Sequence, residues 1–279
     1  MSTKRKILFV FGMLLIALGV GYLSYSLASG IRAKQNQETM HSIAFRETTT
    51  VPETEEPTTV PNTTQTPAVT ETEEPTVTTT EYKEPYVSPI DFEALWEINP
   101  DIYAWLELVD TDISYPVLQH PTDNEYYLYH TPEGESGYPG SIYSFNVNAK
   151  DFTDFNTVLY GHRMNNGTMF SKLHEYRDET YLKEHQTIKI YLPDRELVYT
   201  IFAAVIYDDR LITSYFDFSD PDSCRAYLNS IYGNRDLNSH VLLKPRVTEN
   251  DRILTLSTCV RWQENNRYLV VAVLTDEIT

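Results

Sequence analysis

Two cysteines, Cys224 and Cys259, are the only thiols in this 279-residue sequence. A cysteine attacks as its thiolate, and a neighbouring His or Arg stabilises that form and orients the sulfur. Cys259 ends the apolar run "RILTLST" and precedes the polar stretch "VRWQENN", so we expect it at the end of a strand. A cysteine in a strand is more often an inert, small apolar residue, so its position alone does not indicate catalysis.

His162 is the histidine best placed to serve such a cysteine. It follows the apolar stretch "NTVLY" and Gly161, and it opens the polar loop "RMNNGT". A side chain at the end of a strand is held by the strand and stays accessible. The cation would be Arg267, at the start of the next predicted strand, or Arg261, which is nearer to Cys259 in sequence. We therefore expect three strand ends to line one rim of a barrel, although spacing alone leaves an ordinary turn histidine and solvated arginines as the simpler interpretation.

The N-terminus carries a predicted membrane anchor at residues 7–31, which contain no charged side chain. A helix needs roughly 20 apolar residues to cross a bilayer. The apolar region of a cleaved signal peptide is shorter, about 7 to 15 residues, and "SLASG" is a weak cleavage site. The basic residues in 1–6 favour a cytoplasmic tail and an extracellular position for the rest of the chain.

A segment dominated by Thr, Pro and Glu follows the anchor, and we predict a disordered stalk at residues 32–86. It has almost nothing apolar to bury, so ordering it would not be compensated, and repeated Pro with like charge keeps it extended. We expect this stalk to hold the following domain away from the membrane. Glycosylation of its Thr residues does not follow from the sequence.

The remaining residues, 87–279, are predicted to form one mainly β domain. Many strands with few, short helices favour a barrel or sandwich over βαβ units. The predicted strands are "DISYPVLQ", "GSIYSF", "NTVLYGH", "TIKIYL", "ELVYTIFAAVIYD", "DRILTLSTC" and "RYLVVAVL". Short helical patterns are "GTMFSKLHEY" and "DPDSCRAYLNSIY", the second with Ser219 or Asp220 as its N-cap and Pro221 in its first turn.

The composition argues against several classes of function. The formal net charge is −18, with 40 acidic and 22 basic side chains, so nucleic-acid binding has little electrostatic support. Two cysteines do not make a disulfide framework, although a Cys224–Cys259 pair stays open. The sequence has neither an H-E-x-x-H motif nor the paired-cysteine spacing of a zinc site, so we expect no metal and no cofactor.

The stretch "TLSTC", followed eight residues later by Arg267 and preceded by "NTVLYGH", resembles the sortases, a family of cysteine transpeptidases of Gram-positive bacteria. The segments "INPDIYAWLEL", "ISYPVLQ", "DNEYYLYHT" and "YGHRMNNGTMFSKLHEY" are similar to class B landmarks in the expected order. The resemblance covers residues 90–274 and implies a sortase-like closed β-barrel with a few short peripheral helices. "GSIYSFNVN" departs from the Phe and Asp that class B sequences often carry after "GSI", and no role is assigned to it.

The resemblance makes Cys259 the nucleophile, His162 the general acid and base, and Arg267 the third catalytic residue, in preference to Arg261. Ser257 lies two residues before Cys259, so it faces the same side of a strand, which by resemblance lines the substrate groove. Cys224 matches no family role and is expected to be structural.

The implied activity is cleavage of a C-terminal sorting motif of secreted proteins and transfer of the acyl group to an amine. That amine would belong to a peptidoglycan precursor of the cell wall, or to a pilin lysine if the enzyme assembles pili. A non-catalytic, membrane-tethered binding domain is the alternative from another class.

Overall fold

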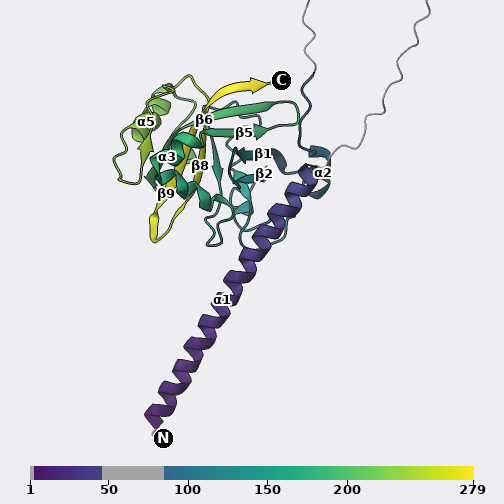
Figure 1. Cartoon of the computed structure of the whole chain (residues 1–279). Helices are drawn as coiled ribbons and strands as arrows, with labels where there is room; N and C mark the ends of the chain where they lie inside the picture. Colours follow the sequence, from purple (N-terminus) through teal and green to yellow (C-terminus); the bar gives the residue numbers. More distant parts are fainter. Residues whose placement is uncertain (1–2, 46–84) are drawn as a thin grey trace, which may run out of the picture.

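The strands in this computed structural model, which describes residues 3–45 and 85–279, form one continuous sheet (Figure 1). Their order is β5-β1-β2-β3-β4-β8-β9-β6-β7, and a further β5–β6 pairing closes the sheet into a barrel that leaves only β7 outside. The expected closed β-barrel is therefore confirmed. The strands are β1 (Ile102–Leu108), β2 (Ser114–Leu118), β3 (Ile142–Ser144), β4 (Asn156–Tyr160), β5 (Thr187–Tyr191), β6 (Glu196–Asp208), β7 (His240–Val241), β8 (Ile253–Val260) and β9 (Gln263–Ile278).

Short helices surround the barrel, as expected. They are α2 (Phe92–Ile98), α3 (Glu179–Glu184), α4 (Ile212–Tyr215), α5 (Pro221–Tyr232) and the 3₁₀ segments η1 (Tyr126–Leu128) and η2 (Phe170–Arg177). Of the two predicted caps of α5, the structure uses Asp220, whose side chain accepts a hydrogen bond from the Asp222 backbone N–H. Pro221 follows at the first helical position, where its missing N–H costs nothing.

Strand β6 is an almost unbroken apolar run because most of its side chains are buried. Leu197, Tyr199 and Ile201 point into the barrel core, and Val205 and Tyr207 join a second core with α5 on the outside of the barrel. A register shift between Ile201 and Ala203 changes the alternation midway along the strand. From Ile201 to Tyr207 both faces of β6 are buried, so no polar residue is needed on either face there.

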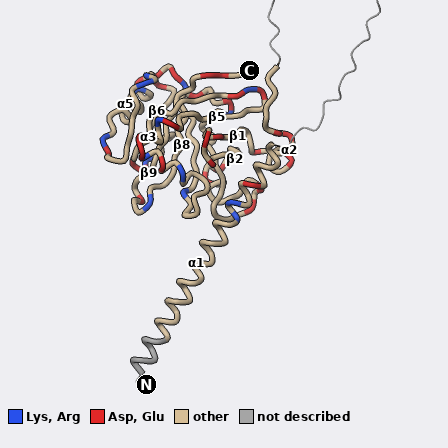
Figure 2. Tube along the Cα trace, in the orientation of Figure 1, with Lys and Arg blue, Asp and Glu red and all other residues tan. Residues whose placement is uncertain are grey.

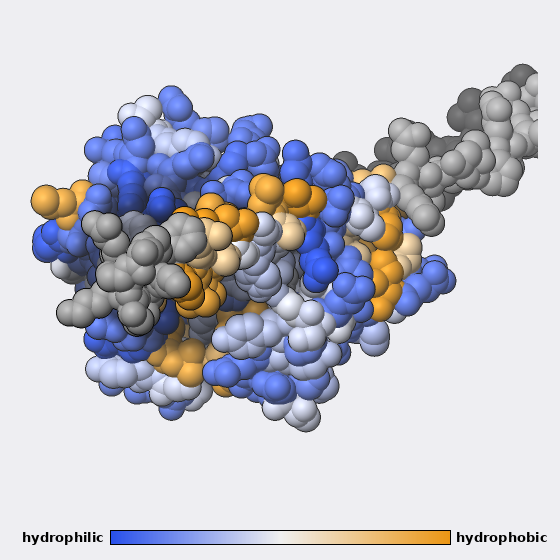
Figure 3. Space-filling view, turned by 90° about the horizontal axis from the view of Figure 1, so that it is seen from below, coloured by the Kyte–Doolittle hydropathy of each residue, from blue (hydrophilic) through white to orange (hydrophobic). Residues whose placement is uncertain are grey.

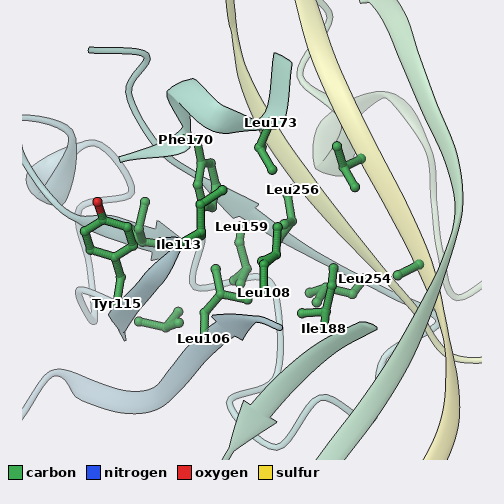
Figure 4. Packing of buried hydrophobic residues seen from close by; sticks show 14 of the residues in the cluster. Leu106, Leu108, Ile113, Tyr115, Leu159, Phe170, Leu173, Ile188, Leu254 and Leu256 are labelled. Atoms are coloured by element: carbon green, nitrogen blue, oxygen red, sulfur yellow. The ribbon is translucent and has the colours of Figure 1, made fainter. Parts of the chain in front are cut away.

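The barrel interior is filled by branched and aromatic side chains from most of the strands, with η2 packed over one end (Figure 4). Leu106, Leu159 and Leu254 come from three different strands and are fully buried. Phe170 and Leu173 of η2 close the core beside them. Because the Phe170 N–H donates to the His162 carbonyl at 3.0 Å, this packing also helps to hold the backbone of His162.

Helix α1 (Thr3–Ala44) extends from the domain on the side opposite the C-terminus (Figure 1). Val10–Ala44 of this helix is long and apolar enough to cross a membrane, and its apolar 18-residue window is not buried by the rest of the described chain. In Figure 2 the part of α1 that protrudes from the domain is tan up to its grey end, so none of its coloured residues there is charged. Figure 3, which looks at the molecule from that side, shows apolar side chains around the grey N-terminal end.

The stalk does not begin at residue 32, because α1 continues to Ala44 and its last turns pack on the domain. Ala33, Met40 and Ala44 are buried, and their spacing places them on one helix face. The Asp91 N–H, just before α2, donates to the Ala44 carbonyl at 2.8 Å. Phe45 packs on Trp105 of β1, with 5.7 Å between ring centroids, so α1 contacts the domain directly on the N-terminal side of the Thr/Pro/Glu segment. Residues 46–84 of the predicted stalk lie outside the described residues.

Candidate active site

The β8–β9 ladder places Arg267 directly opposite Cys259. Side chains in such cross-strand positions have Cβ atoms about 4.5–5.5 Å apart, so a guanidinium can reach the space in front of the sulfur. The register shifts after Cys259, and the hairpin turns at Arg261 and Trp262. Arg261 is therefore carried past the ladder position that faces the thiol.

Parallel pairing of β4 with β8 brings His162 to the same level. Tyr160 pairs with Ser257, and the Gly161 N–H extends the ladder by donating to the Ser257 carbonyl at 3.2 Å. The Thr258 hydroxyl then donates to the Gly161 carbonyl at 2.8 Å. Residues on parallel strands advance together, so His162 arrives opposite Cys259.

All four predicted site residues line one cavity of about 280 Å³: His162, Ser257, Cys259 and Arg267. Ser257 and Cys259 share the cavity side, as strand alternation predicts. Arg261 does not line it; its guanidinium lies over the Trp262 ring, 4.9 Å from the ring centroid. A larger cavity, about 670 Å³, lies between α1 and the loop after His162 and is lined by none of the four.

His162 is oriented by its surroundings. Its Nε2 lies 2.9 Å from the Leu128 carbonyl, and its ring packs on Tyr138 with 4.7 Å between centroids. A carbonyl only accepts, so Nε2 carries the hydrogen, and Nδ1 holds the lone pair of the neutral ring. Burial lowers the pKa of His162 below its ordinary 6.5, and the Leu128 hydrogen bond opposes this more weakly. The site therefore favours a neutral imidazole at neutral pH.

The two cysteines occupy opposite environments, and neither is in a disulfide. Cys259 is exposed at the cavity. Cys224 is buried in α5, and its Sγ lies 3.4 Å from the Phe218 carbonyl. Burial, followed by the charge of Asp220, raises the pKa of Cys224. Only Cys259 combines access with a neighbouring histidine and arginine.

Arg267 is held by carbonyls of the hairpin rather than by an acid. Its Nη1 donates to the Glu264 carbonyl at 3.0 Å and to the Asn266 carbonyl at 3.1 Å. None of the ion pairs among the described residues includes Arg267. Its positive charge at the cavity is therefore not cancelled by a salt bridge with a described carboxylate.

His174 contacts the backbone of the nucleophile strand, a role that no pattern in the sequence predicted. Its Nε2 donates to the Cys259 carbonyl at 3.0 Å, and its ring packs on Tyr268 at 4.9 Å. Burial lowers the pKa of His174 to about 4, against the weaker effect of this hydrogen bond. His174 stays neutral and ties η2 to the strand end that carries the thiol.

The opposite wall of the cavity is apolar and aromatic, and it was also missed. Tyr143 and Phe145 come from "GSIYSFNVN", to which no role was assigned, and Tyr160 packs on Phe145 at 4.7 Å. Positions 143 and 145 alternate along a strand, so the pattern itself indicates that they share a face. The described residues contain no group of three His, Cys, Asp or Glu side chains arranged to hold a metal ion.

Comparison with known proteins agrees with this geometry. The sortase domain model matches residues 106–275, so the chain belongs to the sortase family of cysteine transpeptidases. Sortase B of Listeria monocytogenes is 35% identical over 167 residues, which are 59% of this chain and 65% of that protein. The match thus spans less than two thirds of the length of that relative.

Solved structures of class B enzymes share the fold. Clostridium perfringens sortase B superposes with a TM-score of 0.60 at 29% identity, covering 66% of this chain and all of that one. A Staphylococcus aureus sortase B–substrate complex superposes with a TM-score of 0.58 at 31% identity, covering 66% of this chain and 84% of that one. The class B resemblance of the sequence is therefore confirmed.

Proposed function

We propose that this chain is a membrane-anchored cysteine transpeptidase that cleaves a sorting motif and joins the new acyl end to an amine. One observation carries the proposal: the β4–β8 and β8–β9 registers bring His162, Cys259 and Arg267 to a single cavity. A non-catalytic binding domain would not require an exposed thiol at the meeting point of these two ladders.

The first half-reaction forms a thioester. The Cys259 thiolate attacks the carbonyl carbon of the scissile peptide bond, and the carbonyl electrons move onto oxygen. Arg267, opposite the sulfur, stabilises this oxyanion and binds the substrate backbone; removal of one such donor typically costs about 10²–10³ in rate. When the C–N bond breaks, His162 in its protonated form gives its proton to the leaving amine; this form is the minor one in the free site, because burial lowers the pKa of His162.

The second half-reaction releases the acyl group. An acceptor amine attacks the thioester carbonyl, neutral His162 takes the proton that this amine loses, and the C–S bond breaks to regenerate the thiolate. The result is a new amide bond, with no net change in protons on the enzyme. The Leu128 carbonyl holds Nε2–H, so Nδ1 is the nitrogen that exchanges protons with the substrate.

The substrate would be an extended peptide lying between Ser257 and the aromatic wall formed by Tyr143, Phe145 and Tyr160. A relative whose structure is a substrate complex shares the fold, which supports a peptide in the equivalent cavity here. The acceptor would be an amine of a peptidoglycan precursor. Helix α1 would cross the cell membrane with residues 1–6 in the cytoplasm and the barrel outside.

The direct test is isolation of the thioester. The full chain in detergent is incubated with sorting peptides of the LPxTG and NPxTx types, acid-quenched and analysed by mass spectrometry. We expect an adduct on Cys259 equal to the N-terminal peptide fragment, which an added amine then removes. A peptide cleaved equally well by Cys259→Ala would overturn the assignment.

A further inference from the structure

Trp262 occupies an unusual position for a tryptophan, at the tip of the β8–β9 hairpin. It is 87% exposed, and its backbone φ is 63°, in the left-handed region that Gly or Asn adopts more easily. The Arg261 guanidinium stacks over its ring. Neither the barrel core nor the catalytic cavity uses this ring, so folding does not account for a large aromatic side chain in this turn.

Three arginines lie near the base of this hairpin. Arg261 is in its turn, Arg177 lies over the ring of Tyr268 on β9 with 5.5 Å to the ring centroid, and Arg163 directly follows His162. Burial, followed by the charges of Arg261 and Arg177, lowers the pKa of Arg163, as expected for neighbouring cations. None of the ion pairs among residues 3–45 and 85–279 includes any of these three arginines. In a chain of net charge −18, three neighbouring cations without a carboxylate partner indicate an anionic ligand outside the chain.

A contact between α1 and the loop after His162 indicates where this anionic ligand would lie. Asn166, three residues after Arg163, donates from Nδ2 to the Gly30 carbonyl at 2.7 Å. Gly30 lies at the end of the uncharged stretch, directly before Ile31 and Arg32, where a membrane span meets water. The loop after His162 therefore lies at the level of the lipid headgroups.

The orientation of α1 is fixed by its packing. Gln37 Nε2 donates to the Asp112 carbonyl at 2.8 Å, and Met40 and Ala44 are buried against the domain. Figure 1 shows the yellow β8–β9 hairpin projecting toward the side on which α1 leaves the domain, and Figure 2 shows basic residues at the hairpin and beside α1. The anchor thus holds the hairpin tip toward the bilayer.

We propose that Arg163, Arg177, Arg261 and Trp262 form a face that docks on the anionic surface of the lipid bilayer. The arginines bind headgroup phosphates, and the Trp262 ring lies at the interface, where Trp is enriched in membrane proteins. The inference rests on the proposed membrane anchor. It places the opening of the Cys259 cavity next to the bilayer, instead of at the end of a long stalk.

Depth-dependent quenching of tryptophan fluorescence tests this docking. The chain has three tryptophans: Trp105 is fully buried, Trp96 lies on α2 where α1 ends, and Trp262 is at the hairpin tip. The full chain is incorporated into vesicles of phosphatidylcholine, with or without 30% phosphatidylglycerol, that contain a headgroup spin-labelled lipid. The Trp262 signal is the difference between the wild type and Trp262→Phe, and Trp96→Phe serves as the matched control.

We expect the Trp262 signal to be quenched in anionic vesicles and the Trp96 signal to be unaffected. Phosphatidylcholine alone, or the double variant R163Q/R261Q, should reduce the quenching severalfold, because each arginine near an anionic surface contributes about a fivefold factor in binding. Trp262→Phe and Arg261→Gln should cleave a soluble peptide in detergent at the wild-type rate.

Two results would overturn the proposal, and they are distinguishable. In the first, the chain co-floats with the vesicles in a density gradient, but Trp262 is accessible to acrylamide and is not quenched by the lipid label; the docking face is then wrong and the membrane anchor stands. In the second, the chain does not co-float with the vesicles, and both the anchor and the docking face are wrong. The thioester assay in detergent is independent of either result.

Discussion

Arg267 lies opposite Cys259 in the β8–β9 ladder, whereas Arg261 lies beyond the register shift with its guanidinium on Trp262. The two arginines should therefore differ in their effect on a soluble peptide. We expect Arg267→Ala to lower the rate of thioester formation by about 10²–10³. Arg261→Ala should change it less than twofold. Single-turnover acylation measured by mass spectrometry compares them.

Arg267→Lys adds a control for charge alone. A lysine retains the positive charge but lacks the planar fork that binds the backbone and the oxyanion together, so most of the loss should persist. If Arg261→Ala proves more damaging than Arg267→Ala, the cation of the site is Arg261 and the register argument fails.

The two cysteines should differ clearly in their reactivity toward thiol reagents. Cys259 is exposed, whereas Cys224 is 3% exposed and burial raises its pKa. A thiol reagent added to the folded chain should label Cys259 alone and stop acylation, since the thiolate form and access control the rate. Peptide mapping after labelling checks this. Cys224→Ser should retain activity, and labelling of Cys224 in the native chain would contradict the prediction.

Sequence patterns predicted the barrel because its strands carry strong local signals. The range predicted for β6, 196–208, agrees with the structure, since β-branched and aromatic residues there serve two cores. The β1 strand was not among the predicted strands; it begins at Ile102, only four residues after α2 ends at Ile98. The end of α1 was missed because residues 32–44 are polar; only Ala33, Met40 and Ala44 mark the buried face.

The site residues that lie at or near the ends of strands could be predicted from the sequence. His162, Ser257, Cys259 and Arg267 come together because parallel and antiparallel ladders fix their levels. His174, Leu128 and Tyr138 were not predicted as site residues, because they reach the site from η2, η1 and a loop, each through a single contact. Contacts of this kind depend on tertiary packing and leave no periodic signal.

Tyr138 should control the titration of His162. Its ring covers the imidazole, and burial is the main cause of the lowered pKa. In Tyr138→Ala we expect the His162 pKa to rise toward 6.5, which increases the protonated fraction at neutral pH. Histidine NMR titration, assigned with His162→Gln, measures this. Tyr129→Ala is the matched control, because that ring is farther away, at 6.5 Å, and should shift the pKa less. An unchanged value in Tyr138→Ala would show that other groups bury His162.

His174 should make the fold sensitive to acid. Its pKa is about 4 in the folded chain and near 6.5 when unfolded, so the unfolded state binds more protons between these values. Stability must therefore fall as the pH drops from 6.5 toward 4, and Arg163 and Arg177 nearby act in the same direction. In His174→Gln, whose amide can still donate to the Cys259 carbonyl, this loss should be smaller. Urea unfolding at pH 7.5, 6 and 5 compares the two; parallel losses would contradict the prediction.

The hydrogen bond between Ala44 and Asp91 predicts that the Thr/Pro/Glu segment is a loop of the domain rather than a spacer. Replacing residues 46–84 with a Gly/Ser linker of about ten residues should retain the fold, because such a linker spans up to about 33 Å. The shorter closed loop should raise the free energy of unfolding by about 1 kcal/mol. Urea unfolding of the full chain in detergent measures this change. The Asp91 amide should stay protected from hydrogen exchange in both forms. A spacer would instead leave that amide free to exchange and make stability independent of its length.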